Sequence, residues 1–348
     1  MSFIATIFGH LGHDPKTPAL HEVFGERIET TTRQRLTSLI ARFRGRLRKA
    51  GVAPGDRVVL LAPNSARWVA ADLAILAEGG VVVPMYARQD PKELTAMMHD
   101  CEPKAVVVAD SVLAASVRKG WAEAPILTFE DLAKGDPVQE PPHTRDPSAP
   151  VTLIYTSGST GEPKGVVTTQ ENVDYMLPQT ATAIGRMIAL GPELDGPEVV
   201  FHYLPFCFAG SRIVLWTCLY RAVALHVSTD LDNLATEIGA VQPHYFLNVP
   251  VLLERIKNKV EEGLAGRPKP IRWLVSEGME AFHKKEAGTA TLRDRLHFRM
   301  ADRIVFRAIR KKIGLRGKRD ERADVVAPCG DAASSLAAIG DAHDRAAA

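Results

Sequence analysis

Short apolar runs that do not alternate with polar residues recur along the first half of the chain. The runs at 57–61, 81–84 and 105–109 are apolar almost throughout. Strands buried on both faces have this composition, whereas strands of a half-exposed sheet alternate between apolar and polar residues. The pattern predicts parallel strands covered by helices on both faces, and therefore an α/β fold.

Helical patterns separate these strands. Apolar residues recur with helical spacing at 31–49, and Asn64 or Ser65 is a candidate N-cap for a second helix. Pro91 begins a third helix, because proline is tolerated in the first turn. This alternation of helices and strands supports the parallel arrangement.

A proline-rich stretch at 137–150 interrupts the alternation. Proline lacks the backbone donor that a helix interior or a central strand needs, so we expect a surface connection here. It leads into an apolar strand at 151–155. The alternation then resumes, with helices expected at 170–189, from about 211, at 231–239 and at 250–263, and strands expected at 198–203, 223–226 and 245–249.

The predicted organisation is therefore two α/β subdomains, residues 1–190 and residues 191–317, the second of them incomplete. From residue 318 onward the composition changes to aspartate, arginine, alanine and glycine, with few large apolar residues. So little apolar surface cannot offset the entropy lost on ordering the chain. We expect residues 318–348 to be a disordered tail.

Composition narrows the function classes. Hydrophobic residues make up 46% of the chain and charged residues 24%, which is typical of a globular protein and excludes disorder of the whole chain. The 43 basic and 41 acidic residues leave a net charge of +2, so we expect no nucleic-acid partner. The 4 cysteines show no paired spacing that would predict a metal site.

The sequence predicts neither a signal peptide nor a membrane span. The N-terminus lacks the basic start and long apolar run of a secretory signal. No window reaches about 18 consecutive apolar residues, the length that a bilayer-spanning helix needs. We expect a cytoplasmic protein, with a peripheral location on a membrane surface as the alternative.

A glycine-rich loop follows the strand at 151–155 and carries the main candidate chemistry. Its sequence is Thr-Ser-Gly-Ser-Thr-Gly-Glu-Pro-Lys-Gly. Glycines let successive backbone N–H groups turn toward one anion, hydroxyls add donors, and the lysine supplies a cation. The predicted ATP phosphate-binding residues are Thr156, Ser157, Gly158, Ser159, Thr160, Gly161, Lys164 and Gly165.

The loop differs from two common nucleotide-binding motifs. Glu162 and Pro163 separate Gly161 from Lys164, whereas the Walker A motif has glycine and lysine adjacent. The loop also lacks the G-x-G-x-x-G of dinucleotide-binding folds. Position for position, it is similar to the signature of the adenylate-forming superfamily, which includes acyl-CoA synthetases, peptide-synthetase adenylation domains and luciferases. A turn-rich surface loop without this function is the alternative.

The resemblance extends from about residue 25 to about residue 317. Gly51–Ser65 with the following Trp68, and the strand at 80–84, resemble the first subdomain of the family. Leu204-Pro205 and Asn248–Pro250 resemble the second subdomain of its long-chain fatty-acyl branch. The resemblance implies the large N-terminal domain of an acyl-CoA synthetase, without the small C-terminal domain.

Resemblance to this branch implies a fatty-acid–CoA ligase that uses ATP, Mg²⁺ and CoA. A carboxylate attacks the α-phosphate of ATP, pyrophosphate leaves, and the acyl adenylate then forms a thioester with CoA. The loop would hold the β- and γ-phosphates, and Thr156 would help to place Mg²⁺. Phe208 occupies the position at which the branch favours histidine, so Phe208 and nearby Gly210 are the candidate acyl pocket. A buried core role is the alternative for Phe208.

Several parts of the family's active site have no counterpart in this sequence. No tyrosine-glycine-x-threonine-glutamate motif, which contacts adenine and the metal in the family, follows Lys164. The ribose-binding aspartate motif, the interdomain hinge and the lysine of the small C-terminal domain are also missing. We therefore expect a truncated chain, through a frameshift near codon 318 or as a short regulatory homologue. Weak or absent ligase activity is expected, and no catalytic residue is assigned.

Three alternatives stay open at this stage. They are adenylation of an aryl or amino acid, a non-catalytic nucleotide-binding fragment, and a chain that does not fold stably. A possible partner is suggested by an arginine-rich helical pattern at 293–312, which suits contact with an anionic membrane. A solvated helix packed on its own domain is the preferred interpretation of that pattern.

Overall fold

The computed structural model describes residues 2–157, 163–190, 194, 196–228, 230–246 and 262–307. The chain divides into two compact units, Met1–Glu237 and Ile238–Ala348. The expected tail at 318–348, the tip of the candidate phosphate loop at 158–162 and most of the helix expected at 250–263 lie outside the described residues.

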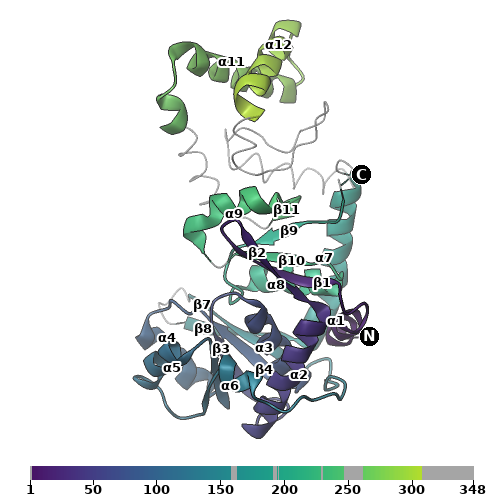
Figure 1. Cartoon of the computed structure of the whole chain (residues 1–348), viewed down its shortest axis with the longest axis vertical. Helices are drawn as coiled ribbons and strands as arrows, with labels where there is room; N and C mark the ends of the chain where they lie inside the picture. The colour runs from purple at the N-terminus through teal and green to yellow at the C-terminus, as the bar shows by residue number, and fades with distance from the viewer. Residues whose placement is uncertain are drawn as a thin grey trace. The chain divides into compact units, whose positions relative to one another are not determined.

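A six-stranded sheet forms the first part of the first unit (Figure 1). Its strand order is β6-β5-β3-β4-β7-β8, and every neighbouring pair is parallel except β7 and β8. The strands are β3 (Arg57–Leu61), β4 (Val81–Met85), β5 (Ala105–Val108), β6 (Ile126–Thr128), β7 (Pro150–Ser157) and β8 (Pro163–Thr169). The predicted parallel α/β fold is confirmed.

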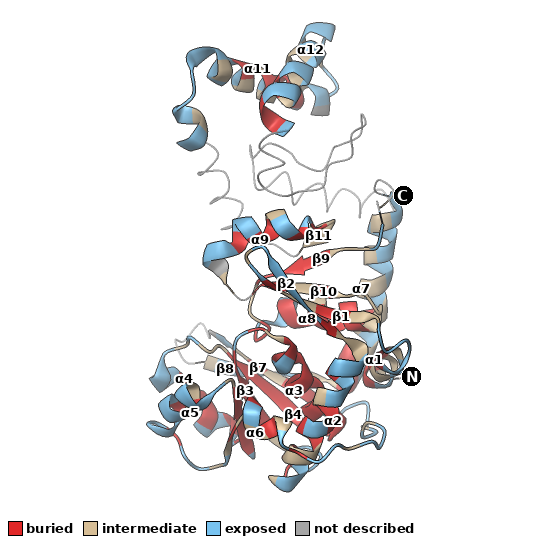
Figure 2. Cartoon of the chain, viewed as in Figure 1, coloured by how far each residue is buried: buried red, intermediate tan, exposed pale blue. Residues whose placement is uncertain are grey.

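Helices cover this sheet and bury its central strands. They are α2 (Arg33–Lys49), α3 (Ala66–Ala77), α4 (Pro91–Cys101), α5 (Ser111–Arg118) and α6 (Phe129–Ala133). Figure 2 shows α3 and the central strands as mostly buried. Ser65 is the N-cap of α3, because its side chain accepts a hydrogen bond from the Trp68 N–H at 3.1 Å. Asn64, the other candidate, has a different role that involves the second sheet.

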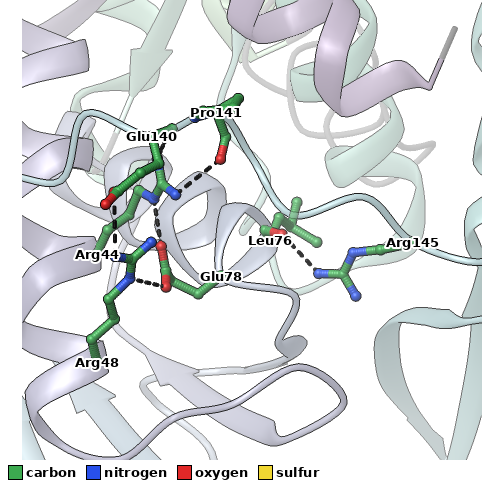
Figure 3. Close-up of polar contacts among 7 residues, drawn as sticks. All are labelled: Arg44, Arg48, Leu76, Glu78, Glu140, Pro141 and Arg145. Carbon is green, nitrogen blue, oxygen red and sulfur yellow. Dashed lines mark hydrogen bonds and ion pairs between the residues drawn. The ribbon is translucent and has the colours of Figure 1, made fainter.

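Buried and half-buried charges hold the proline-rich connection against the sheet's helices (Figure 3). The Arg44 Nε donates to Glu78 Oε1 at 2.6 Å, and its Nη1 donates to the Glu140 carbonyl oxygen at 2.5 Å. Arg48 also pairs with Glu78, at 2.6 Å. Arg145 donates to the carbonyl oxygen of Leu76 at 2.8 Å. The stretch that the sequence predicts as a surface connection is therefore anchored by its side chains and its backbone.

A second sheet in the first unit contains β9, β10, β1 and β2, side by side in that order. Their bounds are β1 (Pro18–Phe24), β2 (Arg27–Thr32), β9 (Val200–His202) and β10 (Leu225–Ser228). The helices of this part are α1 (Phe3–Gly12), α7 (Gln170–Leu190), α8 (Ala209–Tyr220), the 3-10 helix η1 (Leu231–Asn233) and α9 (Leu234–Val241), the last of which reaches into the second unit.

Strand β1 is parallel to β10 and antiparallel to β2, with Leu20 opposite Leu225 and Thr31. A strand near the N-terminus thus pairs with one from beyond residue 190. The subdomain bounds 1–190 and 191–317 stay a prediction.

In the second unit, the described elements are β11 (Tyr245–Phe246), α11 (Lys269–Glu286), α12 (Leu292–Ala301) and the π-helix η2 (Asp302–Phe306). A small apolar core joins α11 to α12 and η2 through Leu274, Ala301, Val305 and Phe306. Within the described ranges, none of the helices has both the length and the apolar character that crossing a bilayer requires.

Candidate phosphate and acyl site

The candidate phosphate loop is the connection of a β-hairpin. Strands β7 and β8 are antiparallel, with Thr156 opposite Lys164 and Tyr155 opposite Gly165. Both Thr156 and Lys164 are exposed. Because β7 is parallel to β4, the loop leaves the sheet at the carboxyl ends of the parallel strands, where α/β proteins bind their ligands.

The structure brings two of the predicted phosphate-binding residues together across the hairpin, namely Thr156 and Lys164. Gly165 lies beside Leu153, whose Cδ1 would be 2.8 Å from an added Cβ. Gly158, Ser159, Thr160 and Gly161 lie outside the described residues, and the structure describes only the backbone of Ser157. In the part of the chain that the structure describes, no ion pair involves Lys164, and its side chain is exposed.

Tyr155 anchors the end of β7 to α4. Its hydroxyl donates to the Asp100 carboxylate and lies 3.2 Å from the Met97 carbonyl oxygen. Burial and the neighbouring Asp100 raise the pKa of Tyr155, so the phenol keeps its proton at neutral pH. The residue just before Thr156 is thus fixed by side-chain bonds as well as by the sheet.

Tyr86 lies at the same edge of the sheet. Val82 of β4 is in register with Thr152 of β7, and the same offset continued by four residues brings Tyr86 level with Thr156. The Tyr86 ring lies 6.1 Å from the Phe208 ring, centroid to centroid. Sequence reasoning missed Tyr86, although its position directly after an apolar parallel strand was a usable signal.

Phe208 is the N-cap residue of α8, and its side chain is 50% exposed. The alternative of a buried core phenylalanine is therefore wrong. Gly210, in the first turn of α8, is also exposed. Phe208 stands next to Tyr86 at the carboxyl edge, and the role of Phe208 and Gly210 as an acyl pocket stays a prediction.

Beneath Phe208, a row of aromatic rings supports the turn that leads into α8. Phe206 lies 5.1 Å from Trp68 and is stacked on His202 at 5.4 Å, centroid to centroid. His202 is fully buried, and burial lowers its pKa to about 4, with the Leu204 backbone acting in the opposite direction. His202 is consequently neutral at pH 7 and contributes shape to this wall.

The described residues around Thr156 do not form a recognisable Mg²⁺ site. Thr156 is the one ligand that the sequence nominates, and it offers a single neutral hydroxyl, whereas Mg²⁺ prefers carboxylates and phosphate oxygens. Across the described ranges, no group of three or more His, Cys, Asp or Glu side chains could hold a metal ion.

Comparison with known protein families matches residues 10–296 to the family described as AMP-binding enzyme. A known relative is the long-chain-fatty-acid–CoA ligase ACSBG2 of Xenopus laevis, 26% identical over 299 residues. The aligned region covers 77% of this chain and 40% of that protein. The chain spans less than half the length of the curated relatives it matches first.

Solved structures share the fold. VinN in complex with L-aspartate superposes with a TM-score of 0.63 at 21% identity, covering 77% of this chain and 67% of that one. The fatty acyl-adenylate ligase from L. pneumophila, solved with acyl adenylate and pyrophosphate, gives a TM-score of 0.59 at 20% identity. The superposition covers 70% of this chain and 44% of that one. At such identities the likeness concerns the fold alone.

Proposed function

The chain belongs to the AMP-binding enzyme family, and from this premise we propose that its β7–β8 hairpin binds the β- and γ-phosphates of ATP. The observation that carries the proposal is the pairing of Thr156 with Lys164 at the carboxyl edge of the sheet. Both residues are exposed, and they offer a hydroxyl and an ammonium group to a polyphosphate at this edge. Backbone N–H groups of the intervening glycine-rich segment would complete the site.

The reaction that this site serves is AMP-forming acid–thiol ligation. The substrate carboxylate attacks the α-phosphorus of ATP, the bond to the bridging oxygen breaks, and pyrophosphate leaves. Lys164 stabilises the negative charge that collects on the departing phosphates, and the fixed hairpin positions them. The acyl adenylate then reacts with the thiol of CoA, releasing AMP. No protein nucleophile is needed in either step.

A long-chain fatty acid is the substrate class that we favour. The support is the name of the relative, a long-chain-fatty-acid–CoA ligase, together with the exposed ring of Phe208 and the half-buried ring of Tyr86 next to it. Such rings offer contact area to an alkyl chain and no charge to a polar side chain. An aryl or amino acid is the second candidate, because VinN, a protein of the same fold, was solved with L-aspartate.

Full turnover by these 348 residues is not what we propose. The sequence contains no tyrosine-glycine-x-threonine-glutamate motif after Lys164, so adenine and metal contacts typical of the family are missing from it. We propose that the chain binds the phosphate part of ATP and pyrophosphate, with weak or absent ligase activity. A non-catalytic nucleotide-binding role is the alternative outcome.

Isothermal titration of the full chain with pyrophosphate and with ATP tests the phosphate site. Lys164→Ala and Thr156→Ala should each weaken binding about tenfold or more, because charge-assisted hydrogen bonds to an anion are lost. Lys92→Ala, which removes an exposed lysine from α4, serves as the matched control. Equal binding by the Lys164→Ala variant and the control would refute the proposed site.

Mass spectrometry after incubation with ATP, Mg²⁺ and a panel of acids separates the remaining alternatives. Acyl-AMP and pyrophosphate from a fatty acid would establish catalysis and its substrate class together. The same products from an aryl or amino acid would move the specificity to the second candidate. Binding without product would support the nucleotide-binding role.

We also propose a lipid-contacting surface in the second unit, from an apolar stripe on α12 and η2. The stripe consists of Leu292, Leu296, Met300 and Ile304, which are 83%, 57%, 45% and 54% exposed and follow one another at four-residue spacing. Arginines flank it, namely Arg293, Arg295, Arg299, Arg303 and Arg307. Apolar side chains beside cations are suited to an anionic lipid surface, from which a fatty acid could be taken. Residues 308–312 of the predicted contact lie outside the described residues.

A further inference from the structure

Arg212 of α8 is a charged side chain with almost no exposure, 1% of its surface. Its Nη2 donates to Asp72 Oδ1 on α3, and its Nη1 donates to the hydroxyl of Thr152 on β7. The Thr152 hydroxyl donates in turn to the Val82 carbonyl oxygen on β4, at 2.7 Å. One guanidinium group therefore connects a helix of the second sheet with two strands and a helix of the first.

The surroundings of Arg212 restrict it to one orientation. Its guanidinium carbon lies 4.4 Å from the ring centroid of Trp216 and 5.9 Å from that of Trp68. Trp216 Nε1 donates to the second carboxylate oxygen of Asp72 at 2.9 Å, so both oxygens of that carboxylate are used. Planar stacking and a forked set of donors hold arginine in a way that lysine cannot reproduce.

A buried ion pair of this kind is weak grounds for stability. Removing two charges from water carries a large desolvation cost, and apolar replacements are often neutral or stabilising. The ion pair forms directional bonds that allow one geometry, whereas a cluster of apolar side chains would allow several. The contacts of Arg212 therefore define how α8 is placed against β7.

Both elements carry candidate site residues beyond this junction, at the same edge of the sheet. Phe208 precedes Arg212 by one helical turn, about 6 Å along the axis. Thr156 follows Thr152 by four residues, about 13 Å along the strand and on the same strand face. The contact between Tyr86 and Phe208 shows that α8 reaches the edge where β7 ends.

We infer that Arg212 is a positioning residue that couples the acyl end of α8, which is its N-terminal end with Phe208 and Gly210, to the hairpin that binds phosphate. This inference rests on the function proposed above. When pyrophosphate binds to the hairpin, the Thr152–Arg212 bond passes the restraint from β7 to the first turn of α8, so Phe208 and Gly210 are held in place before the acyl ligand arrives. Coupling of this type works through rigidity and requires no large movement.

Two substitutions at Thr152 isolate the link without touching Arg212 or the loop. Thr152→Val keeps the volume of this buried side chain and removes the hydroxyl that joins β7 to Arg212. Thr152→Ser keeps the hydroxyl and is the conservative rescue. A merely structural role would alter the resting structure in both liganded and free protein, whereas the inference predicts the loss of a ligand-induced change.

Hydrogen–deuterium exchange of the full chain, with and without pyrophosphate, tests the coupling. In the parent protein and in Thr152→Ser, pyrophosphate should slow amide exchange at 163–168 and also at 208–213, each about fivefold, the low end of couplings between protein sites. In Thr152→Val, the protection at 163–168 should persist and that at 208–213 should vanish. Residues 126–133, at the far edge of the same sheet, should be unchanged throughout.

The other outcomes each decide something. Protection at 163–168 without any at 208–213 in the parent protein would overturn the coupling and leave the phosphate site standing. Protection at 208–213 that survives Thr152→Val would show that Arg212 is not the link. No protection at either segment, or the same protection in Lys164→Ala, would overturn the phosphate site and the coupling with it.

Discussion

Asn64 accepts a hydrogen bond from the backbone N–H of Phe206 at 2.8 Å, and its Nδ2 donates to the Leu204 carbonyl oxygen, also at 2.8 Å. Asn64 follows the last residues of β3 in the first sheet, whereas Phe206 precedes α8, which belongs to the second. The buried side-chain amide of Asn64 thus supplies the hydrogen bonds that the backbone of the turn before Phe208 needs. The placement of the candidate acyl end depends on this pair as well as on Arg212.

Replacing Asn64 should therefore loosen the turn. Asn64→Ala is expected to lower the free energy of unfolding by about 2–3 kcal/mol, because it removes the Asn64 partner of the buried Phe206 N–H and of the partly buried Leu204 carbonyl oxygen. Asn172→Ala, which removes an exposed side-chain bond to the Thr169 N–H, should cost about 1 kcal/mol. Urea denaturation followed by circular dichroism measures both, and equal losses would contradict the buried role of Asn64.

Glu78 links Arg44 and Arg48, and its removal should be severe. Glu78→Gln is expected to cost about 3–5 kcal/mol, because it leaves the buried Arg44 without a compensating charge. Glu130→Gln provides the matched control, since its ion pair with Lys134 is 80% exposed on the glutamate side and should contribute under about 1 kcal/mol. Similar midpoints for the two variants in urea would refute this assignment.

His202 should make stability depend on pH. Its folded-state pKa of about 4 lies below its ordinary value of 6.5, so between these values the unfolded chain binds a proton that the folded chain does not. The contribution of neutral His202 to the free energy of unfolding is therefore complete above pH 6.5. It declines as the pH falls toward 4, and below pH 4 this group changes the stability no further.

The expected size of this effect is about 3 kcal/mol. His202→Phe, which keeps a flat ring stacked on Phe206, should remove that part of the decline and leave a shallower curve between pH 6.5 and 4. His202→Leu serves as a second variant in case the larger ring is not accommodated. Unfolding free energies measured by urea at several pH values would show it, and parallel curves for all three proteins would rule out this role.

Two helical glycines should respond oppositely to alanine. A Cβ at Gly45 of α2 would lie 1.9 Å from the Asp136 carbonyl oxygen, a backbone atom that cannot move aside alone. Gly45→Ala should destabilise the protein by about 2 kcal/mol or more. A Cβ at Gly9 of α1 would meet none of the described atoms within 4 Å beyond its own helix backbone and chain neighbours, so Gly9→Ala should stabilise the protein by up to about 1 kcal/mol. Thermal melting of both variants measures the difference in sign.

The stripe on α12 predicts binding to anionic vesicles. The full chain should float with vesicles of phosphatidylserine and phosphatidylcholine at low salt, and Leu296→Asp should reduce the bound fraction at least about fivefold, because a charge would enter the apolar layer. Val112→Asp changes an equally apolar but isolated residue, 78% exposed on α5, and should bind as the parent does. Flotation that is unaffected by Leu296→Asp, or none at all, would dispose of the lipid surface.

Local sequence predicted the elements whose signal is local. The strand at 57–61 is buried on both faces, and its almost unbroken apolar run predicts this burial. Strand β8 was not predicted, because most of its residues are exposed and it forms through pairing with β7. Strands β1 and β2 were missed for a related reason, since nothing near Leu20 specifies Leu225 as its neighbour.

The candidate site divides in the same way. The candidate phosphate-binding residues lie in one continuous segment of the sequence, so Thr156 and Lys164 could be predicted from spacing and residue type alone. Tyr86, Asn64 and Arg212 acquire their positions from strand register and from the meeting of two sheets. Their neighbours are distant in sequence, and a single sequence offers no means of pairing them.

The parallel pairing of β1 with β10 has a consequence for biosynthesis. Leu20 leaves the ribosome long before Leu225, by about 10–40 s at usual rates of translation. During that interval the six-stranded sheet, which ends at Thr169, can complete itself, whereas β1 and β2 wait with one edge unpaired. Such an edge attracts other strands, so chaperone capture of nascent chains should concentrate on residues 18–32. Strand β1 is therefore synthesised early but is among the last strands to gain its partner, β10.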